Sequence, residues 1–280
     1  MFRRVFVQSL CLAFFALGCE KTGEKSVAAA REHVASLQKT VATDVGEVRQ
    51  GLPEGAKHLA SLFDGDKTPA DDLPAVRDAL EKARSKVQDL RVAKSTFFAL
   101  VSPSGAVWRN DQEQDLMAGK NMFASFPKLK DALDGKYHEG RGSMPEAARV
   151  KGGDGQWVAA QPLVRDGKTV ALYVTGWSWS AYAYRLENAL RGQVRSDQGS
   201  AEDKLPLIYV YVVVGDSAYG APVSPEVNAK AIVEQKPLGK MQDGIFATAL
   251  EIAERKFALA VGKTPELGDD VAVAVLRSET

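Results

Sequence analysis

The sequence predicts an α+β fold in which N-terminal helices precede two similar units, each built on an antiparallel sheet. Three observations support this prediction. Residues 26–94 repeat apolar side chains at helical spacing, and residues 95–280 contain short apolar runs bounded by glycine and proline turns. The order of these runs occurs twice. Apolar residues make up 45% of the chain and charged residues 26%, which is the ordinary globular mixture.

The first residues have the layout of a secretory signal peptide. Arg3 and Arg4 precede an apolar run of about 13 residues that ends at Leu17, too short for a membrane-spanning helix of about 20. Ala16-Leu17-Gly18-Cys19 resembles the lipobox of bacterial lipoproteins. That resemblance implies cleavage before Cys19 and acylation of its thiol and amino group, with palmitate among the acyl chains. The alternative is an ordinary signal peptide with an incidental cysteine.

The cysteine count agrees with lipid attachment. Cys11 and Cys19 are the two cysteines of the chain, so a chain cleaved before Cys19 cannot form an internal disulfide. We therefore expect residues 1–18 to be a lipoprotein signal peptide and residues 19–25 a polar tether. The expected location is the bacterial cell envelope, facing the periplasm. Glu20 favours the outer over the inner membrane, since in many lipoproteins aspartate at this position retains the protein at the inner membrane.

The charge balance argues against a nucleic-acid partner. The chain has 36 basic and 36 acidic residues, and loss of Arg3 and Arg4 with the signal peptide leaves two more acids than bases. Such a surface does not steer the protein toward nucleic acid or anionic lipid. We expect the lipid on Cys19 to be the membrane attachment.

Residues 26–94 read as two or three helices. Four valines recur every seven residues, with Ala30 and Leu37 between them, and form a narrow coiled-coil-like seam that Asp44 interrupts. These valines are Val27, Val34, Val41 and Val48. Gly51, Pro53 and Gly55 are expected to break the helix. A further amphipathic helix begins near Pro74.

Residues 95–196 are predicted to form the first sheet unit. A strand at residues 96–101 is followed by a glycine turn, a short return strand, a helix ending at Gly135 and a strand near residues 137–143. Two longer strands then flank the turn Arg165-Asp166-Gly167-Lys168, a hairpin signal. A helix starting at Ser180 and a polar linker near residues 197–204 close the unit.

Residues 205–280 repeat this order and are predicted to form a second, weaker unit. A buried strand, a glycine turn, a short strand and a helix opened by Ser224 and Pro225 precede three closing strands. Residues 154–160 also resemble residues 243–249 in sequence. Internal duplication of one α+β unit is the simplest interpretation.

Residues 75–190 resemble the extracytoplasmic Cache domain, a PAS-like sensor module of bacterial receptors. The resemblance rests on residues 98–107, 119–123 and 159–164, and it extends to residues 205–280 by element order alone. It implies a five-stranded antiparallel sheet with a small-molecule pocket between sheet and helices. The Tyr/Arg/Trp/Asp set of the amino-acid-binding members is not found, so the ligand cannot be carried over. Receptors of the family continue into a membrane helix and a cytoplasmic module. This chain stops at Thr280, so we expect it to signal through a separate protein.

No catalytic constellation stands out, and we do not expect an enzyme. The histidines His33, His58 and His138 do not form a ligand-spaced pair, so no metal site and no cofactor are predicted. Residues 176–180 lack the second glycine of a nucleophile elbow.

Aromatic side chains favour a binding module instead. Tyr173, Trp177 and Trp179 share one parity on a predicted strand, and aromatic rings form flat apolar walls that suit small ligands. Trp108, Arg109 and Asp111 lie on or after the short strand that borders the pocket in the resembled family, and an arginine can clamp a carboxylate. The predicted ligand-binding residues are Trp108, Arg109, Asp111, Tyr173 and Trp177. Alternatively, these rings simply pack against the leading helix.

Two functions remain open on the sequence. The first is a lipid-anchored extracytoplasmic sensory protein that binds a small molecule and signals through a separate partner. The alternative is an envelope interaction or scaffold lipoprotein without a small-molecule ligand, whose valine seam between Val27 and Val48 docks a partner.

Overall fold

A computed structural model describes most of the chain. It covers residues 12–64, 68–148, 154–198, 205–241 and 244–279, with side chains described from Gly23 onward. Thr40–Arg185 form one compact unit, called here the first-sheet unit, and the residues up to Lys39 join Leu186–Thr280 in the second-sheet unit. Residues 1–11 of the predicted signal peptide and the side chain of Cys19 lie outside the described residues.

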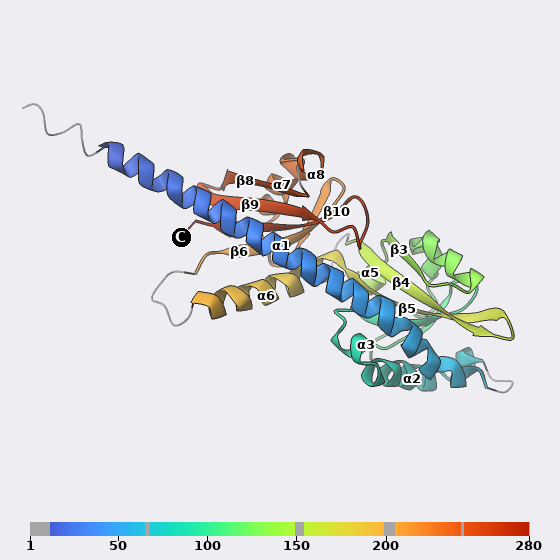
Figure 1. The fold of residues 1–280 in the computed structure, drawn as a ribbon. Helices are drawn as coiled ribbons and strands as arrows, with labels where there is room; N and C mark the ends of the chain where they lie inside the picture. The colour runs from blue at the N-terminus through green and yellow to red at the C-terminus, as the bar shows by residue number, and fades with distance from the viewer. Residues whose placement is uncertain (1–11, 65–67, 149–153, 199–204, 242–243, 280) are drawn as a thin grey trace, which may run out of the picture. The chain divides into compact units, whose positions relative to one another are not determined.

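Each unit contains a five-stranded antiparallel sheet, and the two sheets have the same strand order. The first sheet runs β2-β1-β5-β4-β3 and the second runs β7-β6-β10-β9-β8, the latter coloured orange to red in Figure 1. The predicted α+β fold with N-terminal helices and two repeated sheet units is confirmed. The strands are β1 (Phe97–Val101), β2 (Val107–Asn110), β3 (His138–Gly142), β4 (Gln156–Arg165), β5 (Lys168–Ser178), β6 (Ile208–Val214), β7 (Ser217–Gly220), β8 (Ile245–Ile252), β9 (Arg255–Lys263) and β10 (Val271–Ser278).

Local sequence signals predicted the β4–β5 turn correctly, but they did not predict which strands of the two units correspond. Asp166 and Gly167 have positive φ angles of 50° and 75°, as the two central residues of a type I′ hairpin require. The similarity between residues 154–160 and 243–249, in contrast, is misleading. The first segment enters β4, the fourth strand of its unit, whereas the second enters β8, the third strand of its unit. A glycine followed by apolar residues can begin many different strands. The similarity therefore does not show which strand of one unit corresponds to which strand of the other.

The helices differ from the predicted ones mainly at their ends. The helix α1 (Leu12–Leu59) includes residues 19–25, where we expected a tether, because lysine and glutamate are good helix formers. Trp179 begins α6 one residue before the predicted start and thus leaves the strand. The remaining elements are η1 (Ala60–Phe63), η2 (Pro69–Asp71), α2 (Leu73–Lys86), α3 (Gln88–Val92), α4 (Met122–Ser125), η3 (Pro127–Asp134), α5 (Pro145–Ala148), α6 (Trp179–Gln198), α7 (Glu226–Glu234) and α8 (Pro237–Lys240).

The expected helix break at Gly51, Pro53 and Gly55 does not occur, since α1 continues through Pro53 to Leu59. A Cβ atom at Gly51 would lie 2.7 Å from Leu90 Cδ2, and one at Gly55 would lie 2.7 Å from Tyr173 Cε1. The two glycines therefore let α1 approach α3 and β5 closely. This packing outweighs a local cost of about 1 kcal/mol per glycine and about 3 kcal/mol for the proline.

In the first-sheet unit, short helices cover one sheet face and long helices cover the other. Phe97 and Val174 on the sheet pack with Met122, Phe126 and Leu129 from α4 and η3, and all five are buried. The second part of α1 packs on the opposite face through the close approach to Tyr173 described above. The space between the sheet and the short helices is thus a packed apolar core.

The second-sheet unit repeats this layering. Ile232 from α7 and Leu238 from α8 pack with Leu259 on one face of the sheet. The first part of α1 lies close to the strands, since a Cβ atom added to Gly262 would lie 2.5 Å from Val34 Cγ1. Val34 here and Val41 in the first-sheet unit are both fully buried. Val48 is fully buried as well, so three of the four valines of the seam are used inside the protein, whereas Val27 is only partly buried.

His33 gives the second-sheet unit a testable pH dependence. Burial and, secondarily, the charge of Arg277 lower the pKa of His33, although Glu32 and Asp197 act in the opposite direction. The folded state then binds this proton more weakly than the unfolded state, so stability falls as the pH drops below about 6.5 toward the folded pKa. We expect His33→Gln to lose less stability than the wild type between pH 7.5 and pH 5.5 in urea titrations. Equal losses in both proteins would contradict this assignment.

Candidate functional site

Trp108 and Arg109 lie at a β-bulge in β2, and their side chains have different neighbours. Leu100 pairs with Arg109 and Val101 with Val107, so Trp108 is an extra residue in β2. The ring of Trp108 lies 6.3 Å from the ring of Phe63.

The guanidinium of Arg109 is occupied by its own loop. It forms an ion pair of 3.0 Å with Asp115 and donates to the carbonyl oxygens of Gln112 (2.8 Å) and Glu113 (3.2 Å). Asp115 also accepts from the backbone N–H of Asn110 at 2.8 Å. Arg109 therefore holds the loop after β2, and its role as a carboxylate clamp stays a prediction without support from this geometry.

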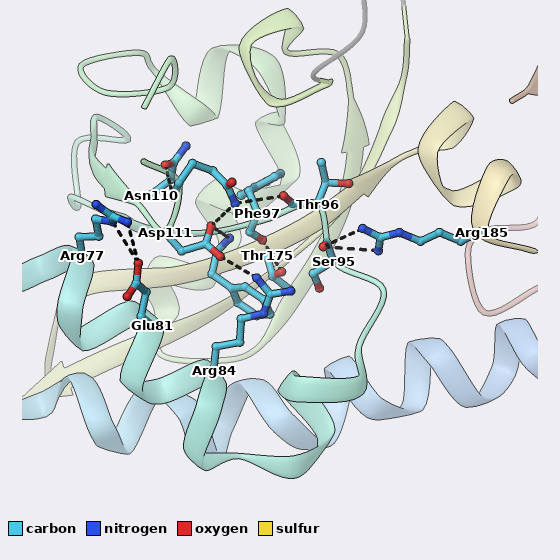
Figure 2. Close-up of polar contacts among 12 residues, drawn as sticks. Arg77, Glu81, Arg84, Ser95, Thr96, Phe97, Asn110, Asp111, Thr175 and Arg185 are labelled. Atoms are coloured by element: carbon cyan, nitrogen blue, oxygen red, sulfur yellow. Dashed lines mark hydrogen bonds and ion pairs between the residues drawn. The ribbon is translucent and has the colours of Figure 1, made fainter. Parts of the chain in front are cut away.

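Asp111 is buried and accepts hydrogen bonds from three directions. Its Oδ1 accepts from the backbone N–H of Phe98 at 2.9 Å and from Gln112 Nε2 at 2.8 Å. Its Oδ2 accepts from Arg84 Nη1 at 3.0 Å. Figure 2 shows Arg84 reaching from α2 to this carboxylate, with Glu81 and Arg77 one and two turns earlier on the same helix. Asp111 thus fixes the position of an arginine that the sequence prediction missed.

An aromatic layer lies behind Arg84. The guanidinium carbon is 5.1 Å from the ring centroid of Phe98, and Phe98 stacks on Tyr173 at 5.8 Å. Tyr173 is fully buried, and its hydroxyl has no hydrogen-bond partner among the described residues. Burial and then the charge of Asp111 raise the pKa of Tyr173, so the phenol stays neutral.

These groups border an open recess of about 320 Å³. It lies where α2 and α3 approach the loop after β2, and its lining residues are Glu81, Arg84, Ser85, Arg91, Asp111 and Gln112. Among the predicted residues, Asp111 lines this recess and Tyr173 lies behind it. Arg77, Arg84 and Arg91 recur every seven residues, which is the sequence signal that could have indicated this basic row.

Trp177 belongs to a separate, fully buried stack. Its ring lies 4.4 Å from Trp157 and 4.6 Å from Tyr182. The Tyr182 hydroxyl donates to Asp44 Oδ2 at 2.7 Å, and Lys94 forms an ion pair with Asp44 Oδ1. Asp44, which interrupts the valine seam, is therefore a buried carboxylate held by two partners. Burial and the neighbouring charge of Asp44 also raise the pKa of Glu47.

A second recess of about 410 Å³ opens between the end of α1 and the β4–β5 hairpin. Pro53, Ala60 and Phe63 form one wall, and Leu163 and Val164 form the other. Phe63 contacts Trp108, so this recess lies near that predicted residue. The predicted residues are thus distributed over two recesses, a buried stack and, for Arg109, the loop after β2.

The described part of the chain offers neither a membrane span nor a metal site. No helix there is sufficiently long and apolar to cross a bilayer. No group of three or more His, Cys, Asp or Glu side chains in those same ranges is arranged to hold a metal ion.

Comparison with known proteins shows likeness in structure but not in sequence. No protein-family model matches the sequence, and no curated protein sequence matches it. One similar structure is the extracellular domain of a protein assigned as a histidine kinase, vpHK1S-Z8, with a TM-score of 0.56 and 10% identity over 92% of this chain and 93% of that one.

Two structures of ligand-binding domains also resemble the chain. The ligand-binding domain of Mlp24 with asparagine has a TM-score of 0.53 and 12% identity over 93% of this chain and 95% of that one. The ligand-binding domain of the Campylobacter jejuni chemoreceptor Tlp3 with 4-methylisoleucine has a TM-score of 0.51 and 10% identity over 91% of each chain. At these identities the likeness establishes a common fold. Along most of its length, the chain therefore shares the fold of these extracellular and ligand-binding domains.

Proposed function

We propose that this protein is a lipid-anchored extracytoplasmic sensory protein that binds a small molecule and signals through a separate partner. The observation that carries the proposal is the pair of sheet units with one strand order, which aligns over more than 90% of the chain with the ligand-binding domains of Mlp24 and Tlp3. The Arg84–Asp111 recess is the proposed ligand site, because it combines an accessible cavity with side chains whose positions are fixed. Cys19 is the proposed lipid attachment.

The scaffold alternative keeps little of its expected docking surface. It required the valine seam to face a partner, but Val34, Val41 and Val48 are fully buried and only Val27 of the four is partly exposed. Aspartate at any of the three buried positions would therefore damage folding first, and the resulting loss of a complex would not identify a docking surface. No specific contact favours the scaffold function over the sensory one.

The ligand proposal is tested by thermal unfolding of the full-length protein with a panel of small acids, amines, sugars and phosphorylated metabolites. A ligand at 100 times its dissociation constant is expected to stabilise the folded state by about 2.7 kcal/mol. If no compound of any class stabilises the protein, the sensory proposal fails.

The anchor proposal has its own test. Mass spectrometry of the mature amino-terminal peptide is expected to show an acylated Cys19 as the first residue. Cys19→Ser should leave the signal peptide uncleaved and abolish acylation. An unmodified, unprocessed amino terminus in the wild type would reject lipid anchoring without affecting the ligand proposal.

A further inference from the structure

The guanidinium of Arg84 is held in one orientation before any ligand arrives. One nitrogen donates to Asp111 and one face lies on Phe98, while Asp111 is itself fixed by two other donors. No other hydrogen bond from the Arg84 guanidinium occurs among the described residues. A fixed planar fork of N–H groups loses little entropy when it binds an oxyanion, which makes it a strong anion ligand.

Arg91 supplies a second guanidinium on the wall of the same recess. Within the described ranges, its side chain has no ion pair or hydrogen bond. It lies on α3, beyond the break at Val87 that separates this helix from α2. Two arginines from two helices therefore border one small cavity.

The acidic residues of the recess cancel only part of this charge. Asp111 accepts three hydrogen bonds, one of them from Arg84, and Glu81 forms an ion pair of 3.0 Å with Arg77. With Arg77 and Glu81 balanced, two positive charges face one buried negative charge. The volume of about 320 Å³ lies at the small end of the range of ligand pockets, roughly 300–1,000 Å³.

We propose that the recess binds a small molecule through a carboxylate or phosphate group, which Arg91 and the oriented edge of Arg84 hold together. The inference rests on the proposed sensory function and names its ligand class. Charge-assisted hydrogen bonds to a planar guanidinium fit both kinds of oxyanion, and Asp111 acts as a positioning residue for Arg84. The hydroxyl of Tyr173 lies behind this site as a neutral group.

The test is isothermal titration of the full-length protein with succinate and citrate in one arm, and glycerol 3-phosphate and inorganic phosphate in the other. Succinamide and glycerol serve as neutral counterparts. Arg91→Gln is the decisive variant, because this side chain has no described partner to lose and the fold should be unaffected. We expect affinity to fall about tenfold or more, with an unchanged unfolding midpoint.

Three further variants test the site, and the last of them compares it with another arginine-bordered recess of the same unit. Arg84→Lys should weaken binding, because lysine cannot present the planar fork. Glu81→Gln should strengthen binding, because it removes a negative charge beside the cavity. Arg165→Gln removes an exposed arginine that borders the larger recess and should leave the affinity within about twofold, as expected for a distant surface charge.

The outcomes are distinguishable. Binding of the neutral counterparts as tightly as the anions, or unchanged affinity in Arg91→Gln, would overturn the anion site while leaving the sensory function intact. A loss of affinity in Arg165→Gln would place the anion elsewhere and would equally overturn it. The arm that binds more tightly identifies carboxylate or phosphate as the physiological group.

Discussion

Lys94→Met is expected to lower the free energy of unfolding by about 3 kcal/mol, because it leaves the buried carboxylate of Asp44 without its cation. Asp44 is 1% exposed and would keep only the Tyr182 hydroxyl among the partners described above. The lower end of the range for a broken buried pair applies, since the Lys94 side chain is itself 28% exposed. Urea unfolding of the two proteins at pH 7 measures the difference.

A matched control and a double variant make this prediction specific. Lys57→Met removes the exposed pair with Glu54, which lies at 2.7 Å, and should cost no more than about 1 kcal/mol. Adding Asp44→Leu to Lys94→Met removes the unpaired charge and should recover most of the loss. If Lys94→Met is no more destabilising than Lys57→Met, Asp44 is not the buried charge that this geometry implies.

Gly55→Ala and Gly46→Ala are expected to change stability in opposite directions, although both glycines lie in α1. A Cβ atom at Gly55 would lie 2.6 Å from Leu90 Cδ1 and 2.7 Å from Tyr173 Cε1, so the side chains of Leu90 and Tyr173 would have to move. Overpacking of this kind costs about 1–3 kcal/mol. No atom lies within 4 Å of a Cβ at Gly46, where alanine should add up to about 1 kcal/mol as a better helix former.

The same pair of variants reports on the recess. Tyr173 stacks on Phe98, and the guanidinium of Arg84 lies over the ring of Phe98. Displacement of Tyr173 in Gly55→Ala should therefore also weaken ligand binding. Gly46→Ala should leave the affinity unchanged. Equal stability of the two variants in urea unfolding would mean that the close approach of α1 to β5 is not maintained in solution.

The sequence itself determined the class of fold and the repeat. Helical periodicity in residues 26–94, strand-rich segments after residue 95 and the Asp166-Gly167 turn are local signals, and each arises from the conformational preference of a few adjacent residues. The recurrence of element order then indicated two similar units. The signal peptide and the lipidation of Cys19 also come from sequence alone and remain predictions.

Only the tertiary structure decided which side chains meet. Arg84 reaches Asp111 across 27 residues of sequence, and Tyr182 reaches Asp44 across 138. Gly51, Pro53 and Gly55 looked like a helix break because their local cost is visible in the sequence, whereas the packing that offsets it is not. The aromatic parity correctly placed Tyr173 and Trp177 on one face of β5, but whether a face lines a cavity or a core depends on helices packed from elsewhere in the chain. Contacts between distant residues are set by the whole packing arrangement, and no local pattern encodes them.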